Sequence, residues 1–235
     1  MAKWIILEKL FKMLFEQKKL EFIFNLRSAG VTNTKLLKIM EELPRDYFIR
    51  NSFKSLGSED IAVPIECGQT TTQPSVIGLM VQALEITPRC KILEIGTGSG
   101  YQTSILAKLG RRIYSIERFR KLTTLARQTI SDLSLANVTL ICGDGTMGLD
   151  NQKPFDRIIV SAAVEDIPSL LLSQLKHNGV LVAPVGRNEP IQTVIRVEKK
   201  YDNYDYKDVK QVKFLPIIEG KEPNETDWNI NSIIN

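Results

Sequence analysis

Short apolar runs alternate with stretches of helical periodicity through the middle of the chain. The β-type runs cover residues 91–95, 112–117, 138–142, 155–160 and 180–184, and the helical stretches around them begin near residues 74, 101, 120 and 168. Strands that alternate with helices form a parallel sheet with helices on both faces. Two further β-type runs, 192–198 and 208–215, flank a polar stretch that contains tyrosines, which predicts an antiparallel hairpin. The pattern therefore predicts an α/β fold: a doubly wound, Rossmann-like, mostly parallel sheet with a C-terminal antiparallel hairpin, plus N-terminal helices.

The first 50 residues have a helical pattern that ends near Pro44. An apolar stripe at helical spacing consists of Trp4, Leu7, Leu10, Phe11, Leu14 and Phe15. The stripe favours a helix that packs on the domain or on a partner subunit over one attached to a membrane surface. Charged residues interrupt the apolar run, so we expect neither a signal peptide nor stable membrane insertion. The oligomeric state stays open between a monomer and a dimer formed through this helix.

The composition excludes several classes of function. The 235 residues are 43% hydrophobic and 25% charged, which is typical of a conventional folded core. The net charge of +4 is small and dispersed, so no nucleic-acid partner is expected. Three widely spaced cysteines indicate neither disulfides nor a metal site, and they fit a reduced, cytoplasmic setting. The single histidine, His177, lies in an expected surface turn, which excludes Ser-His-Asp hydrolysis and histidine-ligated metals.

The most informative segment is CKILEIGTGSGY at residues 90–101. A buried strand, a glycine turn and a helix in this order bind nucleotides in open α/β sheets. The glycine spacing is G-x-G-x-G rather than the G-x-G-x-x-G of a dinucleotide site, which disfavours an NAD-dependent oxidoreductase. Glu94, Glu117 and Asp144 lie at or just after the carboxyl ends of three successive strands, where ligands bind. An acid beside the turn suits the cationic sulfonium and amino group of S-adenosyl-L-methionine and repels a pyrophosphate.

A series of motifs surrounds this turn. In chain order they are MEELPRDYF at 40–48, GQTTTQP at 68–74, ILEIGTGSGYQTSILAKLG at 92–110, YSIER at 114–118, GDGTMGL at 143–149, PFDRIIVSAA at 154–163, LVAPVG at 181–186 and VKFLPI at 212–217. Together they resemble the protein-L-isoaspartate O-methyltransferase family, within the class I S-adenosyl-L-methionine-dependent methyltransferases, over about residues 26–220. The combination of an upstream GQTxxQP with a downstream GDGTxGL makes the resemblance specific.

The resemblance implies S-adenosyl-L-methionine as the cofactor, S-adenosyl-L-homocysteine as its product, and isoaspartyl-containing peptides and proteins as the substrates. It places the cofactor-binding residues at Thr70, Thr71, Thr72, Glu94, Gly96, Thr97, Gly98, Ser99, Gly100, Glu117, Arg118, Asp144 and Gly145. Within this set the glycine turn is expected to hold the methionine part, Glu117 the ribose hydroxyls, and Asp144 with the Gly145 amide the adenine. Thr72 replaces a family serine that is thought to bind the substrate carboxylate, so it is the candidate catalytic residue.

The departures from the family pattern fall on the substrate side. Glu66 stands where the family has a glycine, and we expect its negative charge near an anionic group of the substrate. Gly57-Ser58 replaces a common Ala-Tyr pair. These changes leave open two alternatives: a methyltransferase of the same fold that acts on another carboxylate or a small molecule, and a non-catalytic adaptor that binds S-adenosyl-L-methionine.

The expected organisation is a single domain with additions at both ends. Residues 1–72 are assigned to an N-terminal helical segment and a substrate-side loop of that domain, and residues 73–220 to the S-adenosyl-L-methionine-binding methyltransferase core. Residues 221–235 are polar and are expected to form a tail.

Overall fold

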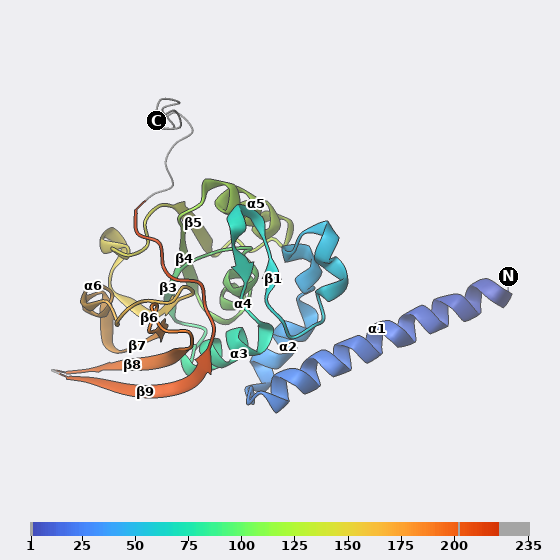
Figure 1. Ribbon diagram of the computed structural model, residues 1–235, viewed down its shortest axis with the longest axis horizontal. Coiled ribbons are helices and arrows are strands. Elements are labelled where there is room, and N and C mark those ends of the chain that lie inside the picture. The colour runs from blue at the N-terminus through green and yellow to red at the C-terminus, as the bar shows by residue number, and fades with distance from the viewer. Residues whose placement is uncertain (1, 202, 221–235) are drawn as a thin grey trace, which may run out of the picture.

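A seven-stranded sheet runs through the centre of the molecule in the order β5-β4-β3-β6-β7-β8-β9 (Figure 1). The structure is a computed structural model that describes residues 2–201 and 203–220, apart from the side chains of residues 2, 3, 5–12, 14 and 15. The strands are β3 (Lys91–Ile95), β4 (Arg112–Glu117), β5 (Val138–Cys142), β6 (Phe155–Val160), β7 (Leu175–Val185), β8 (Gln192–Lys200) and β9 (Asn203–Val212). The pairs from β5 to β7 are parallel, and β7-β8 and β8-β9 are antiparallel.

The mostly parallel sheet with a C-terminal hairpin confirms the predicted fold class, but two strands differ from the expectation. Strand β7 begins at Leu175, so His177 lies in a strand rather than a turn, with its ring centroid 4.0 Å from that of Tyr201. Tyr204 and Tyr206 of the polar stretch belong to β9, which begins at Asn203, whereas Tyr201 lies in the turn between β8 and β9. Strand β9 is an edge strand whose side chains are mostly exposed. Its sequence is therefore polar and resembles that of a turn.

Helices cover both faces of the sheet (Figure 1). They are α1 (Ala2–Ser28), α2 (Thr34–Glu42), α3 (Pro74–Ala83), α4 (Tyr101–Leu109), α5 (Arg120–Asp132) and α6 (Ser169–Ser173). Residues 51–72, expected as a loop, contain short 3₁₀ turns and a two-stranded sheet of β1 (Val63–Pro64) and β2 (Thr70–Thr71). This small antiparallel sheet, with the turn that joins its strands, is called the β1–β2 arm below.

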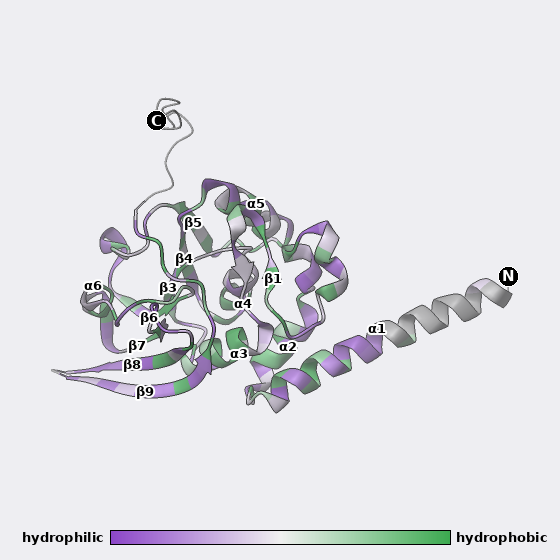
Figure 2. Cartoon of the chain, in the orientation of Figure 1, coloured by the Kyte–Doolittle hydropathy of each residue, from purple (hydrophilic) through white to green (hydrophobic). Residues whose placement is uncertain are grey.

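The alternation of side chains along β3 divides the core into two clusters. Ile92 packs with α2, α3 and α4 on one face, whereas Leu93 and Ile95 pack with α6 on the other. The same alternation puts Glu94 on the face of Ile92, beneath α4. The hydropathy colouring shows the strands inside the sheet as mainly apolar and the hairpin β8–β9 as mixed (Figure 2).

Helix α1 packs on the domain only at its C-terminal end and projects from the body along most of its length (Figure 1). Phe22 and Leu26 are buried against the core formed with α2 and α3, whereas Met13, Leu20 and Phe24 are exposed. Of the predicted stripe, Trp4 is exposed, and the other five side chains lie outside the described ones. None of the described helices is long and apolar enough to cross a bilayer. The predicted tail at 221–235 lies outside the described residues.

We predict that Leu26→Ala lowers the free energy of unfolding by about 2–5 kcal/mol, because it opens a cavity where a fully buried side chain holds α1 to the body. The control Leu20→Ala, on the exposed face of the same helix, should change it by less than about 0.5 kcal/mol. Urea denaturation followed by circular dichroism measures both values. Equal decreases in the free energy of unfolding for the two variants would contradict the described packing of α1 on the body.

Candidate cofactor and substrate site

The turn after β3 requires glycine at its first position. Gly96 has a φ of +91°, and a Cβ there would lie 3.2 Å from the carbonyl oxygen of Ser161 at the end of β6. Gly98 and Gly100 also have positive φ values, +53° and +86°. Only glycine adopts such conformations at no steric cost, so the chain can turn here and present the amides at the start of α4.

Glu94 supports this turn from below, where its side chain is buried beneath α4. Its carboxylate accepts hydrogen bonds from Gln102 Nε2 at 2.9 Å, Thr103 Oγ1 at 2.5 Å and Ser115 Oγ at 2.6 Å. The side chain is fully buried, and this burial raises the pKa of Glu94 to about 7. The expected contact between Glu94 and the cation of the cofactor is therefore corrected: the alternation of β3 turns this acid under α4.

Glu117, at the end of β4, faces the turn directly. Its Oε2 accepts a hydrogen bond from Gly98 N at 2.8 Å, and its Oε1 accepts one from Phe119 N at 3.0 Å. Glu117 also lines the cavity above this turn, where its carboxylate oxygens can accept hydrogen bonds from a ligand. A diol at this edge of the sheet fits that capacity, which agrees with the predicted role in binding ribose hydroxyls.

A cavity opens above the carboxyl ends of β3, β4 and β5, and we call it the first cavity. The predicted residues that line it are Thr70, Thr71, Thr72, Gly96, Thr97, Gly98, Ser99, Glu117, Arg118, Asp144 and Gly145. Glu94 and Gly100 are not among its lining residues. A Cβ on Gly100 would lie 3.3 Å from Ala126 Cβ, so this glycine serves the packing of α4 on α5.

Several residues of the first cavity were missed by the sequence reasoning. They include Ile65, Gln102, Phe119, Leu122, Ser161, Ala162 and residues 216–218. Ser161 and Ala162 directly follow β6, so the same strand-end rule that selected Asp144 could have found them. Residues 216–218 carry no such signal, because they come from the segment after the hairpin.

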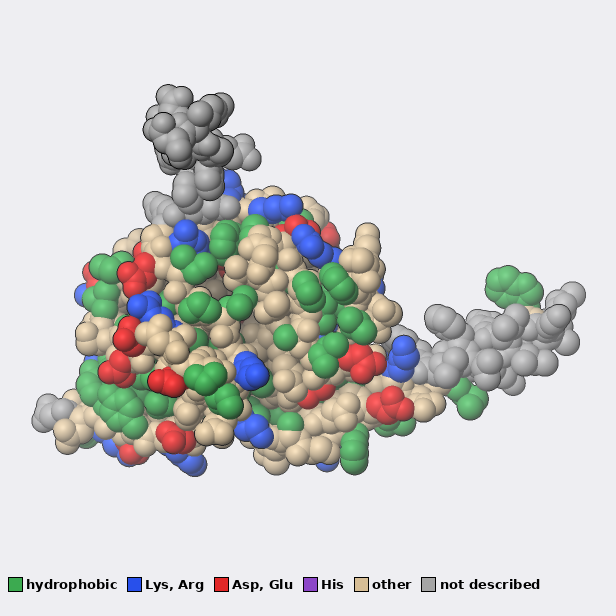
Figure 3. Space-filling view, in the orientation of Figure 1, with side chains coloured by type: hydrophobic (Ala, Val, Ile, Leu, Met, Phe, Trp, Pro, Cys, Tyr) green, Lys and Arg blue, Asp and Glu red, His purple; other side chains and the backbone are tan. Residues whose placement is uncertain are grey.

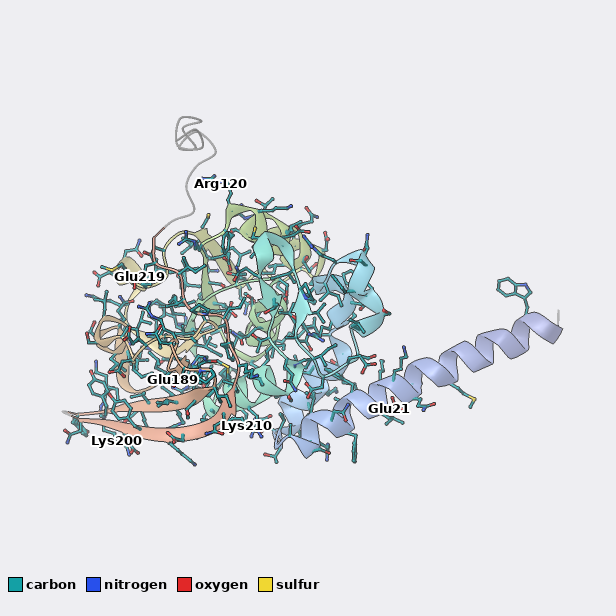
Figure 4. The ribbon with its side chains drawn as sticks, in the orientation of Figure 1. Glu21, Arg120, Glu189, Lys200, Lys210 and Glu219 are labelled. Atoms are coloured by element: carbon teal, nitrogen blue, oxygen red, sulfur yellow. The ribbon has the colours of Figure 1, made fainter. Side chains whose placement is uncertain are left out.

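This C-terminal segment is held over one end of the first cavity. Gly220 N donates to Asp144 Oδ2 at 2.8 Å, and Arg118 Nη1 donates to the carbonyl oxygens of Glu219 at 2.5 Å and Gly220 at 2.9 Å. Thr146 donates to the other oxygen of Asp144 from its amide and its hydroxyl. Burial acts to raise the pKa of Asp144, but the bonds from Thr146 and Gly220 and the nearby Arg118 lower it on balance. Figure 4 shows Glu219 beside the end of the described chain.

A second cavity of about 580 Å³ adjoins the first. It lies between α3, the residues before the β1–β2 arm, and the end of β9 with the segment that follows. The two cavities share Gln69, Thr70, Thr71, Thr72, Ser161, Ala162 and Pro216 as a common wall. The surface in Figure 3 is hollowed near the centre of the face that carries this wall.

The threonines of the wall differ in their burial. Thr71 is buried, and its Oγ1 accepts hydrogen bonds from Arg45 Nη2 at 2.8 Å and Val63 N at 3.3 Å. Thr70, the other residue of β2, is exposed. Thr72 directly follows β2, is half-buried and lines both cavities, so it lies at their junction.

Arg45 fixes the arm to the domain. Its buried guanidinium donates to the carbonyl oxygens of Glu59 at 2.9 Å and Ile61 at 2.7 Å, in addition to Thr71. These bonds join Arg45, which follows the N-terminal helices, to the residues just before the arm and to Thr71 within it. A buried charge is tolerated when it is hydrogen-bonded in this way.

Glu66 does not face either cavity with an unpaired charge. Its carboxylate is bonded by Arg50 Nε at 2.7 Å and Arg50 Nη2 at 2.5 Å, and Lys121 Nζ lies 3.0 Å away. The bonds from Arg50 and Lys121 lower the pKa of Glu66 to about 2. Glu66 lines neither of the two cavities, so the expected negative charge beside the substrate is corrected to a compensated ion pair.

Comparison with known proteins shows the family of this chain. The model of the protein-L-isoaspartate(D-aspartate) O-methyltransferase family matches residues 17–222. The chain belongs to this family. The protein-L-isoaspartate O-methyltransferase of Ruegeria pomeroyi is 50% identical over 204 residues, covering 87% of this chain and 95% of that protein. The corresponding protein of Paracoccus denitrificans is 49% identical over 204 residues, covering 87% of this chain and 94% of that protein.

Solved structures show the same fold. A protein-L-isoaspartate O-methyltransferase structure matches with a TM-score of 0.75 and 26% identity over 84% of this chain, which spans 65% of that chain. A putative protein-L-isoaspartate O-methyltransferase from Plasmodium falciparum, in complex with S-adenosyl-L-homocysteine, matches with a TM-score of 0.71 and 21% identity, covering 84% of this chain and 97% of that chain. The predicted family, the methyltransferase activity and the S-adenosyl-L-methionine cofactor are thereby confirmed.

We predict that Glu94 makes the stability of this methyltransferase fall as the pH rises from about 4.5 to about 7. In this window the folded protein keeps a proton on Glu94 that the unfolded chain releases, because the pKa is raised by burial from 4.5 to about 7. The loss is on the order of 3 kcal/mol and is complete above the folded-state pKa. In Glu94→Gln the group is neutral throughout, so its unfolding free energy should change less across the window.

Urea denaturation of wild type and Glu94→Gln at several pH values between 4.5 and 8 measures this difference, and the contributions of all other titrating groups cancel in the comparison. Parallel pH profiles for the two proteins would show that Glu94 keeps an ordinary pKa in the folded state.

Proposed function

We propose that Thr72 orients the free α-carboxylate of an L-isoaspartyl residue for methyl transfer, in the repair of damaged proteins. The observation that carries this proposal is the position of Thr72 on the wall shared by both cavities. A group held there reaches the first cavity from the second. The family match supports the isoaspartyl substrate, and the cofactor assignment supports the first cavity as the donor side.

In the first cavity the proposed contacts follow the strand ends. Glu117 accepts bonds from the ribose hydroxyls, the amides after Gly96 hold the methionine part, and Asp144 with Gly145 lies at the adenine end. The cavity has a volume of about 120 Å³, less than the roughly 300–1,000 Å³ typical of small-ligand sites. We therefore expect residues 216–220 to move outward when the cofactor enters.

The chemistry requires no general base. A carboxylate with a pKa near ~3.5 is ionised at pH 7 and is already a nucleophile. S-adenosyl-L-methionine, when bound, supplies a methyl group activated by its sulfonium. The chain positions the carboxylate and excludes water with apolar side chains such as Ile65, Phe119 and Leu122. Positioning of this kind contributes up to ~7–11 kcal/mol to lowering a barrier.

The cellular setting belongs to the same proposal. Cys67, Cys90 and Cys142 are free thiols, which supports a reduced, cytoplasmic compartment. The proposed division into residues 1–72, 73–220 and 221–235 keeps the β1–β2 arm with the N-terminal segment, to which Arg45 joins it. Sedimentation of the full chain distinguishes the two expected oligomeric states, a monomer and a dimer formed through α1.

We predict that Thr72→Ala lowers kcat/KM for an isoaspartyl peptide by about 10- to 100-fold, because one hydrogen bond to a charged group is lost. Thr72→Ser keeps the hydroxyl and should retain most of the activity. The Kd of S-adenosyl-L-homocysteine, measured by isothermal titration, should change little in either variant. Methylation is followed by methanol release, with the matching aspartyl peptide as the negative control.

Equal kcat/KM values for Thr72→Ala and wild type would remove Thr72 from the reaction. Methylation of the aspartyl control at the same rate would favour a methyltransferase for other carboxylates. Binding of S-adenosyl-L-homocysteine without turnover of any peptide would favour the adaptor.

A further inference from the structure

The second cavity is larger than the isoaspartyl carboxylate requires. Its volume of about 580 Å³ falls within the roughly 300–1,000 Å³ of sites that bind small ligands. It extends from the shared wall along α3, past Val76 and Leu79, to the end of β9. Because it is continuous with the proposed transfer site, the residues that flank an isoaspartate in a peptide would lie in it.

The charged side chains that line this cavity are Asp60, Lys210 and Lys213. Asp60 is occupied within the protein: it accepts hydrogen bonds from Gln73 Nε2 at 2.9 Å and Ser75 N at 2.7 Å. The carboxylate of Asp60 is therefore already hydrogen-bonded within the protein.

The two lysines differ from Asp60 in this respect. Lys210 and Lys213 are exposed, and neither ammonium has a hydrogen-bond or ion-pair partner among residues 2–201 and 203–220. Figure 4 shows Lys210 at the end of β9 nearest the body, whereas Lys200 lies toward the far end of the hairpin. Lys200 is paired with Asp205 at 3.0 Å. The cavity thus has a surplus of positive charge close to the shared wall.

We infer that the second cavity binds the residues that flank the isoaspartate and selects acidic ones through Lys210 and Lys213. This inference rests on the proposed function of the shared wall. A carboxylate on a flanking residue gains a charge-assisted contact there, whereas a lysine or arginine is repelled. The apolar side chains of Val76, Leu79 and Phe214 provide contact area for the rest of the peptide.

Lysines on an edge strand also prevent sheets from pairing edge to edge, and this role alone would leave substrate choice unaffected. Lys207 distinguishes the two explanations. It is exposed on β9 like Lys210, but it does not line the second cavity. If substitution of Lys210 and Lys213 changes the substrate preference and substitution of Lys207 does not, the preference arises from the second cavity and not from the edge strand.

The experiment uses three isoaspartyl peptides that differ only in the two residues on one side of the isoaspartate, which are both glutamate, both glutamine or both lysine. A second set of three peptides carries the same changes on the other side of the isoaspartate. In wild type at low salt, KM should rise by about 3- to 10-fold from the glutamate to the lysine peptide for at least one side. The double variant Lys210→Glu/Lys213→Glu should reverse the order, and Lys207→Glu should keep the wild-type order. The preference should weaken at high salt, because the contacts are exposed.

Fluorescence anisotropy of the same labelled peptides, with S-adenosyl-L-homocysteine present, measures binding without turnover. The same flank order in the double variant and wild type, by KM and by anisotropy, would overturn the inference. So would equal binding of all flanks to wild type. A different result would show that the proposed function itself is wrong. In that case no isoaspartyl peptide is methylated in preference to its aspartyl control, whatever its flanking residues are.

Discussion

The buried guanidinium of Arg45 is the interaction on which the site geometry depends. A charge with 4% exposure would be strongly destabilising without partners, and here it has three acceptors, two just before the β1–β2 arm and one within it. One of them is the Thr71 hydroxyl, so the contact fixes this buried side chain directly beside Thr72, which lines both cavities. The same contact thus sets the wall between the two cavities and the residue proposed to orient the substrate.

A second buried network lies beneath the side of this wall that faces the first cavity. Glu94 joins Gln102 and Thr103 of α4 to Ser115 of β4, and Gln102 Nε2 also donates to Ser161 Oγ at 2.6 Å. The strand ends of β3, β4 and β6 are therefore tied together under the glycine turn. A glycine turn is conformationally permissive, so these side-chain bonds compensate for the freedom that the sequence introduces there.

Local patterns were enough to predict much of this protein. Apolar runs gave the bounds of β3 to β6, and the strand-end rule selected Glu117 and Asp144, both of which line the first cavity. Two features that the sequence did not reveal depend on contact between segments distant in sequence. The pairing of Glu66 with Arg50 and Lys121, and the bond between Gly220 and Asp144 across 76 positions, leave no periodic signal. Glu94 is a different case, because the period of two along β3 already implied that it faces α4 with Ile92.

In the proposed function, methyl transfer takes place at the first cavity and the second cavity binds the residues that flank the isoaspartate. The first cavity uses strand ends and a glycine turn, as expected for class I methyltransferases, whereas the second is formed by α3, the β1–β2 arm and the hairpin. The central claim is that substrate and cofactor meet at the wall between them. A crystal structure with S-adenosyl-L-homocysteine and an isoaspartyl peptide tests it most directly. The account predicts the peptide carboxylate within about 3 Å of Thr72 Oγ1, with the flanking residues in the second cavity. A peptide bound elsewhere, with its carboxylate away from the β1–β2 arm, would contradict it.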